Sequence, residues 1–360
     1  MAESKSTILI PDISGFTEFM TSTELTHGSL AINYLIEAML KAVGEEYEVA
    51  EIEGDAVLLI KKGPPPSKKE IQDMCLKIFN AFHYQRKWMQ QHTICPCGAC
   101  QAIINLSVKF VAHHGPLAEI KVGRFVKPSG TEMIVAHRLL KNSINNNEYL
   151  LLTEKLLQQV ADGAEEEMDW TRSSEEYPSI GKIDYRFTLL NEARNNVPDP
   201  PPVQNHYRTD NTSHLETGID ANYFDAYLIV TNIPGRKEWM PGLKTVEQKE
   251  PEVYIGSIHQ CVFEDYEATV SPLRMTVSVE GIMFAESCFI SQMDLALVYE
   301  YVFKKIDENT CSFSGRFMNA VESPIPEEMS AVLSKQLRQM SEQLKAICEK
   351  KKNTELMSSE

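Results

Sequence analysis

Two short stretches near the N-terminus, each an apolar run with an aspartate at one end, constrain most strongly what this chain can fold into. In residues 8–17, ILIPDISGFT, the apolar run ends at Asp12 and a turn of small residues follows. In residues 51–60, EIEGDAVLLI, a Gly-Asp turn leads into the apolar run, so Asp55 stands at its start. Such runs, bounded by turn residues, are typical of buried strands. As neighbours in one sheet they would hold Asp12 and Asp55 side by side, and two adjacent carboxylates repel each other unless a divalent cation lies between them.

An aspartate at the end of a strand also has a structural interpretation, because it often forms a turn or caps a helix. Together, and in this order, DISGFT and EGDAVLLI resemble the two metal-binding stretches of the class III nucleotide cyclases, F-x-D-I-x-G-F-T and I-G-D-A. The resemblance implies a cyclase-type domain whose Asp12, Ile13 (through its backbone) and Asp55 bind two Mg²⁺ or Mn²⁺ ions beneath a nucleoside triphosphate.

The resemblance also implies how the rest of the nucleotide is held. The amides of Gly15, Phe16 and Thr17, at a predicted helix N-terminus, would hold phosphate oxygens, and Gly54 lets the hairpin pass close to the ligand. Glu51 occupies the position at which a glutamate goes with guanine in the family, because a carboxylate accepts hydrogen bonds from that base. An exposed strand charge is the alternative for Glu51. The expected substrate is therefore a purine nucleotide, which the enzyme would convert to a 3′,5′-cyclic nucleotide and pyrophosphate.

A third family element, G-x-x-V-N-x-A-x-R, corresponds to residues 130–138, GTEMIVAHR. The family's arginine stabilises the transition state and is matched by Arg138, whose planar guanidinium suits phosphate charge. The family's asparagine orients the ribose and is replaced by Ile134. Asn142, one turn beyond Arg138, and Lys182, in an Ile-Gly-Lys turn, are the substitutes that the chain offers. The metal half of the site is thus expected to be intact and the transition-state half incomplete.

Two functional alternatives follow from this mixed site. The first is an adenylate or guanylate cyclase-like enzyme, and the second is a catalytically degenerate cyclase fold that binds a nucleotide or another small ligand without turnover. Since one chain carries a single such domain, either form is expected to be a homodimer with two equivalent sites. Each site would take Asp12 and Asp55 from one chain and Arg138 from the other.

Size, charge and cysteine content limit the number of domains, the partners and the location that can be expected for the chain. At 360 residues it is too long for one ordinary core, so two domains are expected. A formal charge of −16 argues against nucleic acid or an anionic membrane as a partner. No apolar run is long enough to span a bilayer. The charged N-terminus lacks a signal-peptide core, and the eight cysteines show no secreted-type framework, so a cytoplasmic location is expected.

The apolar pattern predicts an α+β protein. Residues 1–193 read as a βαββαβ succession, a ferredoxin-like sheet with helices on one face, whose other face needs a partner. Within it, residues 102–112 are predicted as a strand, 113–116 as a turn containing His113 and His114, and 131–143 as a helix. The polar, proline-rich residues 194–218 are predicted to be a linker. Residues 219–352 read as antiparallel strands followed by an amphipathic helix over 326–349, and residues 353–360 as a disordered tail.

The second domain resembles the START-like (SRPBCC) helix-grip fold in the segment NIPGRKEWMPGLKTVE and the strand GSIHQCVF. The resemblance implies an apolar cavity for a hydrophobic small molecule, which could control the first domain. The candidate ligand contacts are Arg236, Trp239, His259 and Glu286, set among apolar strands. The alternatives are structural hydrogen bonds for the three polar residues, a core position for Trp239, and a sheet packed on its helix without a cavity.

Three cysteines and a histidine fall within nine residues, as His92, Cys95, Cys97 and Cys100. Zinc prefers such nitrogen and sulfur ligands, although C-x-C-x₂-C is not a usual zinc spacing. His83 is a further candidate ligand. The alternative is a turn with incidental reduced cysteines.

Overall fold

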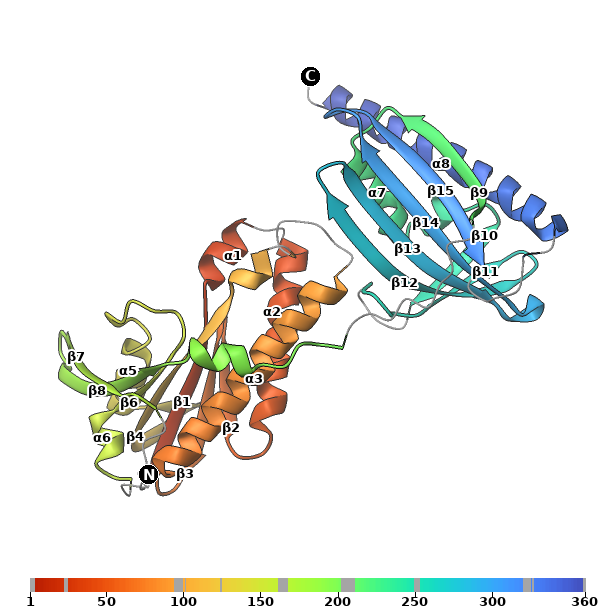
Figure 1. Ribbon diagram of the computed structural model, residues 1–360. Helices are drawn as coiled ribbons and strands as arrows, with labels where there is room; N and C mark the ends of the chain where they lie inside the picture. Colours follow the sequence, from red (N-terminus) through yellow and green to blue (C-terminus); the bar gives the residue numbers. More distant parts are fainter. Residues whose placement is uncertain are drawn as a thin grey trace. The chain divides into compact units, whose positions relative to one another are not determined.

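The chain forms two compact units in the computed structural model (Figure 1). The structure describes residues 4–22, 25–93, 100, 102–123, 125–160, 168–201, 211–248, 253–319, 325 and 327–358. The first unit comprises residues 1–91 and 97–200, and the second comprises residues 92–96 and 201–360. Within the described part, no helix is both long enough and apolar enough to cross a membrane.

The first unit is built from an eight-stranded sheet and several helices, so the predicted α+β class is confirmed. Its strands are β1 (Ser4–Ser14), β2 (Glu48–Glu53), β3 (Ala56–Lys62), β4 (Ser107–Val122), β5 (Phe125–Ser129), β6 (Tyr149–Thr153), β7 (Thr171–Tyr177) and β8 (Gly181–Leu189). Its helices are α1 (Phe16–Ser22), α2 (Leu25–Val43), α3 (Lys68–His92), α5 (Thr131–Arg138) and α6 (Glu154–Leu157), with the 3-10 helices η1 (Ile103–Asn105) and η2 (Glu192–Asn196).

The strand order places β1 in the interior of this sheet. The order is β2-β3-β1-β4-β6-β8-β7, with β5 paired to β4 alone. β1 runs antiparallel to β3 and to β4, and the register sets Asp12 opposite both Ala56 and Lys109. The succession β1-α2-β2-β3-α3-β4 has the βαββαβ order expected from the sequence.

Both faces of this sheet carry helices, which corrects the expectation that helices lie on one face only (Figure 1). Leu9 of β1 packs in the core formed by α2 and α3, together with residues such as Leu35. Ile8 and Ile10 point to the other face, where they form a core with Met133 of α5. The physical reason is that β1 is apolar at successive positions, and such a strand is stable only when both of its faces are buried.

Three predicted boundaries differ from the structure. β4 continues through His113 and His114, which are buried, so the turn predicted at 113–116 is wrong. Helix α5 ends at Arg138 rather than at residue 143. The hydroxyl of Tyr177 donates to the carbonyls of Arg138 and Lys141, which satisfies backbone groups that a longer helix would use. The predicted linker, 194–218, also overlaps the strand β9 of the second unit (Asn211–Ile219).

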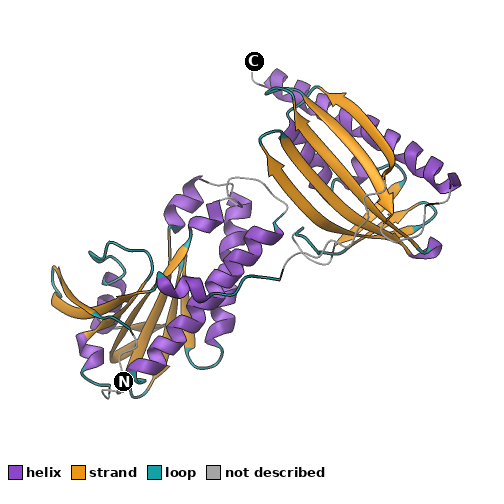
Figure 2. Cartoon of the chain, in the orientation of Figure 1, coloured by secondary structure: helices purple, strands orange, loops and turns teal. Residues whose placement is uncertain are grey.

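The second unit is built around a seven-stranded antiparallel sheet (Figure 2). The sheet order is β10-β11-β12-β13-β14-β15-β9. Its remaining strands are β10 (Leu243–Gln248), β11 (His259–Phe263), β12 (Glu267–Ser278), β13 (Gly281–Ile290), β14 (Leu295–Lys305) and β15 (Cys311–Asn319). Its helices are α7 (Tyr223–Thr231) and α8 (Glu327–Ser358), with the 3-10 helices η3 (Arg236–Glu238) and η4 (Ser291–Met293).

Both α-helices of the second unit pack on this sheet through apolar side chains. Tyr227 of α7 meets Phe284 and Phe303 edge-on, with ring centroids 6.2 and 5.8 Å apart. Leu337 and Leu344 of α8 are buried in the same core. Helix α8 extends to Ser358, so the disordered tail predicted from residue 353 is corrected over residues 353–358, whose backbone is helical.

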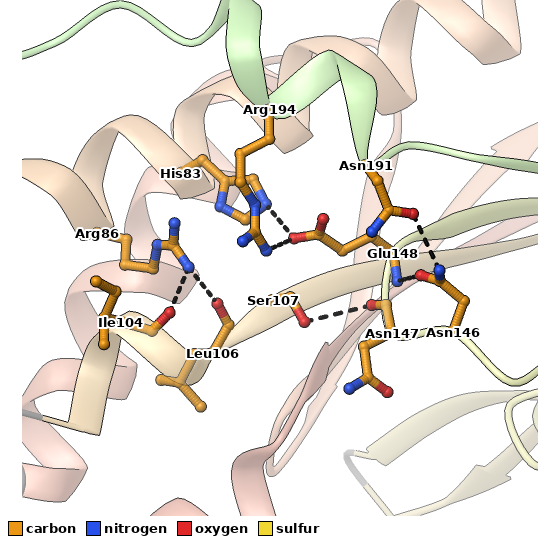
Figure 3. Close-up of polar contacts among 10 residues, drawn as sticks. All are labelled: His83, Arg86, Ile104, Leu106, Ser107, Asn146, Asn147, Glu148, Asn191 and Arg194. Atoms are coloured by element: carbon orange, nitrogen blue, oxygen red, sulfur yellow. Dashed lines mark hydrogen bonds and ion pairs between the residues drawn. The ribbon is translucent and has the colours of Figure 1, made fainter.

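A buried ionic network holds α3 to the end of the first sheet (Figure 3). His83 of α3 and Arg194 of η2 both reach the carboxylate of Glu148, which lies just before β6. The side chains of His83 and Glu148 are 0% and 2% exposed. Burial alone would raise the pKa of Glu148, but the bonds from His83 and Arg194 outweigh it and lower that pKa. The network therefore joins α3, β6 and the segment by which the chain leaves the first unit.

We expect Glu148→Ala to lower the free energy of unfolding by about 3 kcal/mol, because it leaves the His83 ring and the Arg194 guanidinium without their acceptor. The measurement is urea denaturation at pH 7 followed by circular dichroism. The matched control is Glu37→Ala, which breaks an exposed ion pair with Lys41 at 3.7 Å and should change stability by less than about 0.5 kcal/mol. Equal stability of the two variants would show that the network contributes nothing.

Candidate functional site

The two aspartates singled out in the sequence lie together at one end of β1 and β3. Asp12 pairs with Ala56, and the backbone N–H of Ile13 donates to the carbonyl of Asp55 at 3.0 Å. The side chain of Asp12 is 13% exposed. Burial raises the pKa of Asp12, the Asp55 charge raises it further, and Lys109 opposes both. Burial likewise raises the pKa of Asp55. The two carboxylates are therefore close enough to repel each other, as a cation-binding pair would be.

Lys109 is a third member of this cluster that the sequence analysis missed. Its ammonium Nζ lies 3.1 Å from Oδ2 of Asp12 and donates to the carbonyl of Leu140 at 3.1 Å. The available signal was a lysine inside an apolar strand, in residues 107–112, SVKFVA. A charged side chain at such a position requires a buried partner. Here the partner is one of the two predicted metal ligands.

The donor set at this end of the sheet suits a hard divalent cation. Carboxylate oxygens are the ligands that Mg²⁺ and Mn²⁺ prefer, and Mg²⁺ is usually held by one or two carboxylates plus water and substrate phosphates. In the described part of the chain, no group of three or more His, Cys, Asp or Glu residues could hold a metal ion. Asp12 and Asp55 would thus supply two protein ligands, with backbone carbonyl, water or phosphate oxygens supplying the others.

The turns next to the two aspartates adopt conformations that need glycine. Gly15 has φ of +88° between the end of β1 and the start of α1, and Gly54 has φ of +66° in the β2–β3 hairpin. A side chain would be strained at both positions. Phe16 and Thr17 form the first turn of α1, so their amides are at its N-terminus. Phosphate binding by these amides stays a prediction.

A cleft of about 590 Å³ opens in the first unit beside α5. Its walls come from β2, from the β4–β5 hairpin, from α5 and from Tyr177 at the end of β7. The lining residues on which the site depends are Glu53, Lys127, Ile134, His137 and Arg138. Asp12 and Asp55 are not among the described residues that line it. In one chain, therefore, the predicted metal acids do not share the described lining of this cleft with the predicted transition-state arginine.

A chain of ion pairs crosses the β2 side of this cleft. Lys127 lies 2.6 Å from Glu51 and 3.8 Å from Glu53, and His137 lies 3.4 Å from Glu53. The hydrogen bond from Lys127 lowers the pKa of Glu51. Glu51, the predicted base-selecting residue, is thus a charged acceptor with an ammonium beside it. This pair offers both an acceptor and donors to a planar base.

The predicted transition-state residues divide into those that reach the cleft and those that do not. Arg138 is exposed and lines it, and so does Ile134, which is 52% exposed. Asn142 does not, because its amide donates to the Leu139 carbonyl and to the Tyr149 hydroxyl. Lys182 pairs with Asp184 on β8 at 2.8 Å, and it too is absent from the described lining. The structure therefore brings neither predicted substitute for the missing asparagine to the cleft.

A second buried cluster, also missed from the sequence, fastens α5 to the sheet. Glu132, in the first turn of α5, accepts from His113 at 2.6 Å and from Lys155 at 2.6 Å. The other ring nitrogen of His113 lies 2.8 Å from the hydroxyl of Thr153. Gly115 makes room for this contact, since a Cβ there would come within 2.7 Å of the Glu132 side chain. By fixing α5 on the sheet, the cluster also positions Ile134, His137 and Arg138, which lie on the same helix.

The predicted zinc ligands fall largely where the structure gives no test. Cys95 and Cys97 lie outside the described residues. His92 ends α3, and Cys100 is half-buried. His83 is already bonded to Glu148, so its use as a ligand would break the network of Figure 3.

The four predicted ligand contacts of the second unit are brought together around Arg236. The guanidinium of Arg236 donates to Glu286 at 2.7 Å, and both side chains are at most 1% exposed. Arg236 also lies 3.2 Å from Nε2 of His259 and stacks over Trp239, 5.9 Å from its ring centroid. The hydroxyl of Tyr301 donates to the second oxygen of Glu286 at 3.1 Å. This is the structural alternative weighed from the sequence.

One cavity that borders this network is very small. It measures about 20 Å³ and is lined by Glu286, Tyr299, Gln336 and Met340, among others. A space of this size holds about one water molecule. This cavity is therefore too small for a hydrophobic ligand.

Comparisons with known proteins match parts of the chain. Residues 32–149 match a family model described as a protein of unknown function (DUF2652), a range that includes Asp55, Lys109 and Arg138 but begins after Asp12. The uncharacterized protein Rv2561/Rv2562 of Mycobacterium tuberculosis (strain ATCC 25618 / H37Rv) is 35% identical over 124 residues. These residues are 34% of this chain, and they span 58% of the length of that relative.

Solved structures similar to the chain include nucleotide cyclases over about half of its length. A bacterial light-regulated adenylyl cyclase is 16% identical, over 54% of this chain and 93% of the cyclase, with a TM-score of 0.39. The adenylyl cyclase CyaB from P. aeruginosa is 14% identical, over 52% of this chain and 95% of CyaB, with a TM-score of 0.35. Ara h 8.0201 is 10% identical, over 38% of this chain and 95% of that protein, with a TM-score of 0.31.

We expect the stability of the second unit to fall in acid because of His259. Burial and the adjacent Arg236 charge lower the pKa of His259 to about 3, whereas an unfolded histidine titrates near 6.5. Since only the unfolded chain takes up this proton between those values, stability is lost as pH falls below about 6.5.

The test compares wild type with His259→Gln, which keeps a neutral acceptor for Arg236 at every pH. Between pH 7 and pH 5, wild type should lose about 2 kcal/mol more unfolding free energy than the variant, measured by urea denaturation. Other buried histidines titrate alike in both proteins, so their effects cancel in the comparison. Parallel pH profiles would contradict the assignment.

Proposed function

We propose that the first unit binds a divalent metal–nucleoside triphosphate complex at two equivalent sites between two copies of the chain. The observation that carries the proposal is that Asp12 and Asp55 adjoin at one end of the sheet, while Arg138 lines a cleft whose described lining includes neither aspartate. In a single chain, the described lining of this cleft thus contains the predicted arginine without the predicted metal ligands. A head-to-tail homodimer, as the cyclase resemblance implies, would complete each half with the other.

The surface around the cleft supports a second copy as the partner. Ile120 and Ile134 line the cleft and are 53% and 52% exposed, and Val126 on the neighbouring strand is 56% exposed. Apolar side chains gathered at one exposed place mark an interaction surface more often than plain solvent-facing surface. Burying them against another chain would also exclude water from the nucleotide.

Cyclisation would join the ribose 3′-oxygen to the α-phosphorus, break the α–β phosphoanhydride bond and release pyrophosphate. The metal lowers the pKa of the attacking hydroxyl and neutralises phosphate charge when it is bound. Arg138 would stabilise the negative charge on the pentavalent phosphorus, since it lines the cleft. Ile134 has no polar atom to orient the ribose, and a missing donor of this kind costs on the order of 2–4 kcal/mol of transition-state stabilisation. We therefore expect turnover to be slow.

A second candidate is a binding protein without turnover. The observation that favours it is that Asn142 is engaged by Leu139 and Tyr149, and Lys182 by Asp184, so neither predicted substitute for the family's asparagine lines the cleft. The two candidates share the metal and the nucleotide, and they differ only in the chemical product.

For the second unit we propose a START-like helix-grip arrangement. The support is the antiparallel seven-stranded sheet, on which α7 and α8 pack. The long helix α8 follows the last strand of this sheet along the chain. The enclosed space of about 20 Å³ gives no support to a bound hydrophobic molecule. Native mass spectrometry of purified protein would reveal one if it is carried.

We expect the wild-type protein to bind Mn²⁺ with ATP or GTP and Asp12→Ala/Asp55→Ala to bind it at least about 100-fold more weakly, because the oxygen ligands are gone. Isothermal titration calorimetry measures both affinities. The control is Asp73→Ala/Glu37→Ala, which removes two exposed acids of α3 and α2 that pair with Lys69 and Lys41. Absence of metal–nucleotide binding in wild type, or its persistence in the aspartate variant, would overturn the proposal.

We further expect Ile134→Asn to raise the rate of cyclic nucleotide formation by about 30- to 1,000-fold, which corresponds to recovery of the 2–4 kcal/mol estimated above. The side chain is half-exposed, so the substitution should fold normally. Chromatographic quantification of cyclic product at saturating Mn²⁺–nucleotide is the measurement, with Ile134→Ala as the control that adds no amide. A variant that binds nucleotide and forms no product would assign the chain to the second candidate.

A further inference from the structure

We infer that Lys109 couples the metal-binding aspartates to the end of the helix that carries Arg138. This inference rests on the proposed function, and it assigns a positioning and regulatory role to a residue outside the cleft. Lys109 is fixed by register, since its backbone in β4 lies opposite that of Asp12 in β1. Its side chain is 19% exposed, so its two contacts are made in a largely enclosed space.

The first contact is with a predicted metal ligand. The ammonium of Lys109 is 3.1 Å from Oδ2 of Asp12, and its charge opposes the rise in the pKa of Asp12 that burial causes. A divalent cation bound to Asp12 would place a second positive charge within a few ångströms of the ammonium. Like charges at that distance, and partly out of water, repel strongly. Metal binding and the Lys109–Asp12 contact therefore compete.

The second contact is with the C-terminal end of α5. The last carbonyls of a helix have no partner within it and need outside donors. Tyr177 donates to the carbonyls of Arg138 and Lys141, the amide of Asn142 donates to that of Leu139, and Lys109 donates to that of Leu140. Three side chains thus bind the four successive carbonyls of residues 138–141. Of these three, Lys109 alone is also bonded to a predicted metal ligand.

The two contacts make Lys109 a link between the two half-sites of one chain. When a metal binds Asp12, the Lys109 ammonium loses its carboxylate partner. Its hydrogen bond to the Leu140 carbonyl changes as a result. The end of α5 sets how Arg138 stands in the cleft. Coupling of this kind is reciprocal, so a ligand on Arg138 would also alter metal affinity at Asp12.

In the proposed homodimer this link joins two different sites. Asp12 of one chain serves one site, and Arg138 of the same chain serves the other. Lys109 would thus couple the metal at the first site to the phosphate-binding arginine at the second. The path is short, because it consists of one side chain and two hydrogen-bonding partners.

The test measures Mn²⁺ affinity, without nucleotide, from the electron paramagnetic resonance signal of free Mn²⁺ in wild type and in Lys109→Met. Methionine keeps the length of the side chain and removes the competing charge. We expect Lys109→Met to bind Mn²⁺ about tenfold more tightly. Lys109→Arg, which keeps the charge, should stay within about threefold of wild type. The control, Lys62→Met, removes an exposed lysine of β3 that pairs with Glu48 at 3.4 Å, and should bind as wild type does.

The coupling itself has a separate readout, hydrogen exchange of the backbone amides in residues 139–144. Saturating Mn²⁺ should speed exchange there in wild type, and it should cause no further change in Lys109→Met, where the Leu140 carbonyl has already lost its donor. Circular dichroism and the thermal midpoint confirm that each variant is folded. Unchanged or weaker Mn²⁺ binding by Lys109→Met would overturn the inference. So would a hydrogen-exchange rate in wild type that stays the same when Mn²⁺ is added. Failure of wild type to bind Mn²⁺ at all would instead be a failure of the proposed function.

Discussion

The register of β1 between β3 and β4 is the constraint on which the rest of the first unit depends. β1 is paired on both sides, and its apolar residues face alternately into the core under α2 and α3 and into the core under α5. A slip of one residue would exchange these two faces. It would also carry Asp12 away from the α5 side, where Lys109 stands. The packing that stabilises the domain and the geometry that brings Asp12, Asp55 and Lys109 together therefore have the same origin.

Short sequence patterns predicted those features of the fold that are determined within short segments of the chain. The apolar runs that end at Asp12 and begin after Asp55 are strands in the structure, and their acids adjoin, because alternation and turn glycines are properties of short segments. The Gly-Pro pair at 115–116 led to the wrong prediction of a turn at 113–116, since this pair is common in turns. Here β4 passes through it because His113 finds Glu132 and Thr153 as partners. Those partners come from α5 and β6, and no pattern within β4 reveals them.

The assignment of Asn142 shows a related limit. Its spacing of four residues from Arg138 places both on one helical face, but only if the helix continues that far. The helix ends at Arg138, because Tyr177 from β7 satisfies its terminal carbonyls. In the second unit, Arg236 meets His259 and Glu286 across sequence separations of 23 and 50 residues. Polar residues among apolar strands indicate that partners exist, but whether a partner is a ligand or another side chain depends on tertiary contacts.

Charge decides in what form a triphosphate can approach the first unit. Asp12 and Asp55 contribute two negative charges, and Lys109 balances one of them. The chain as a whole carries a formal charge of −16. A free triphosphate would meet a repulsive field at the aspartates, both locally and at long range. The same field concentrates divalent cations, and a triphosphate that already carries a metal has less charge to be repelled. Under the proposed function, this charge distribution favours entry of the nucleotide as its metal complex, and the metal would displace the Lys109 ammonium from Asp12.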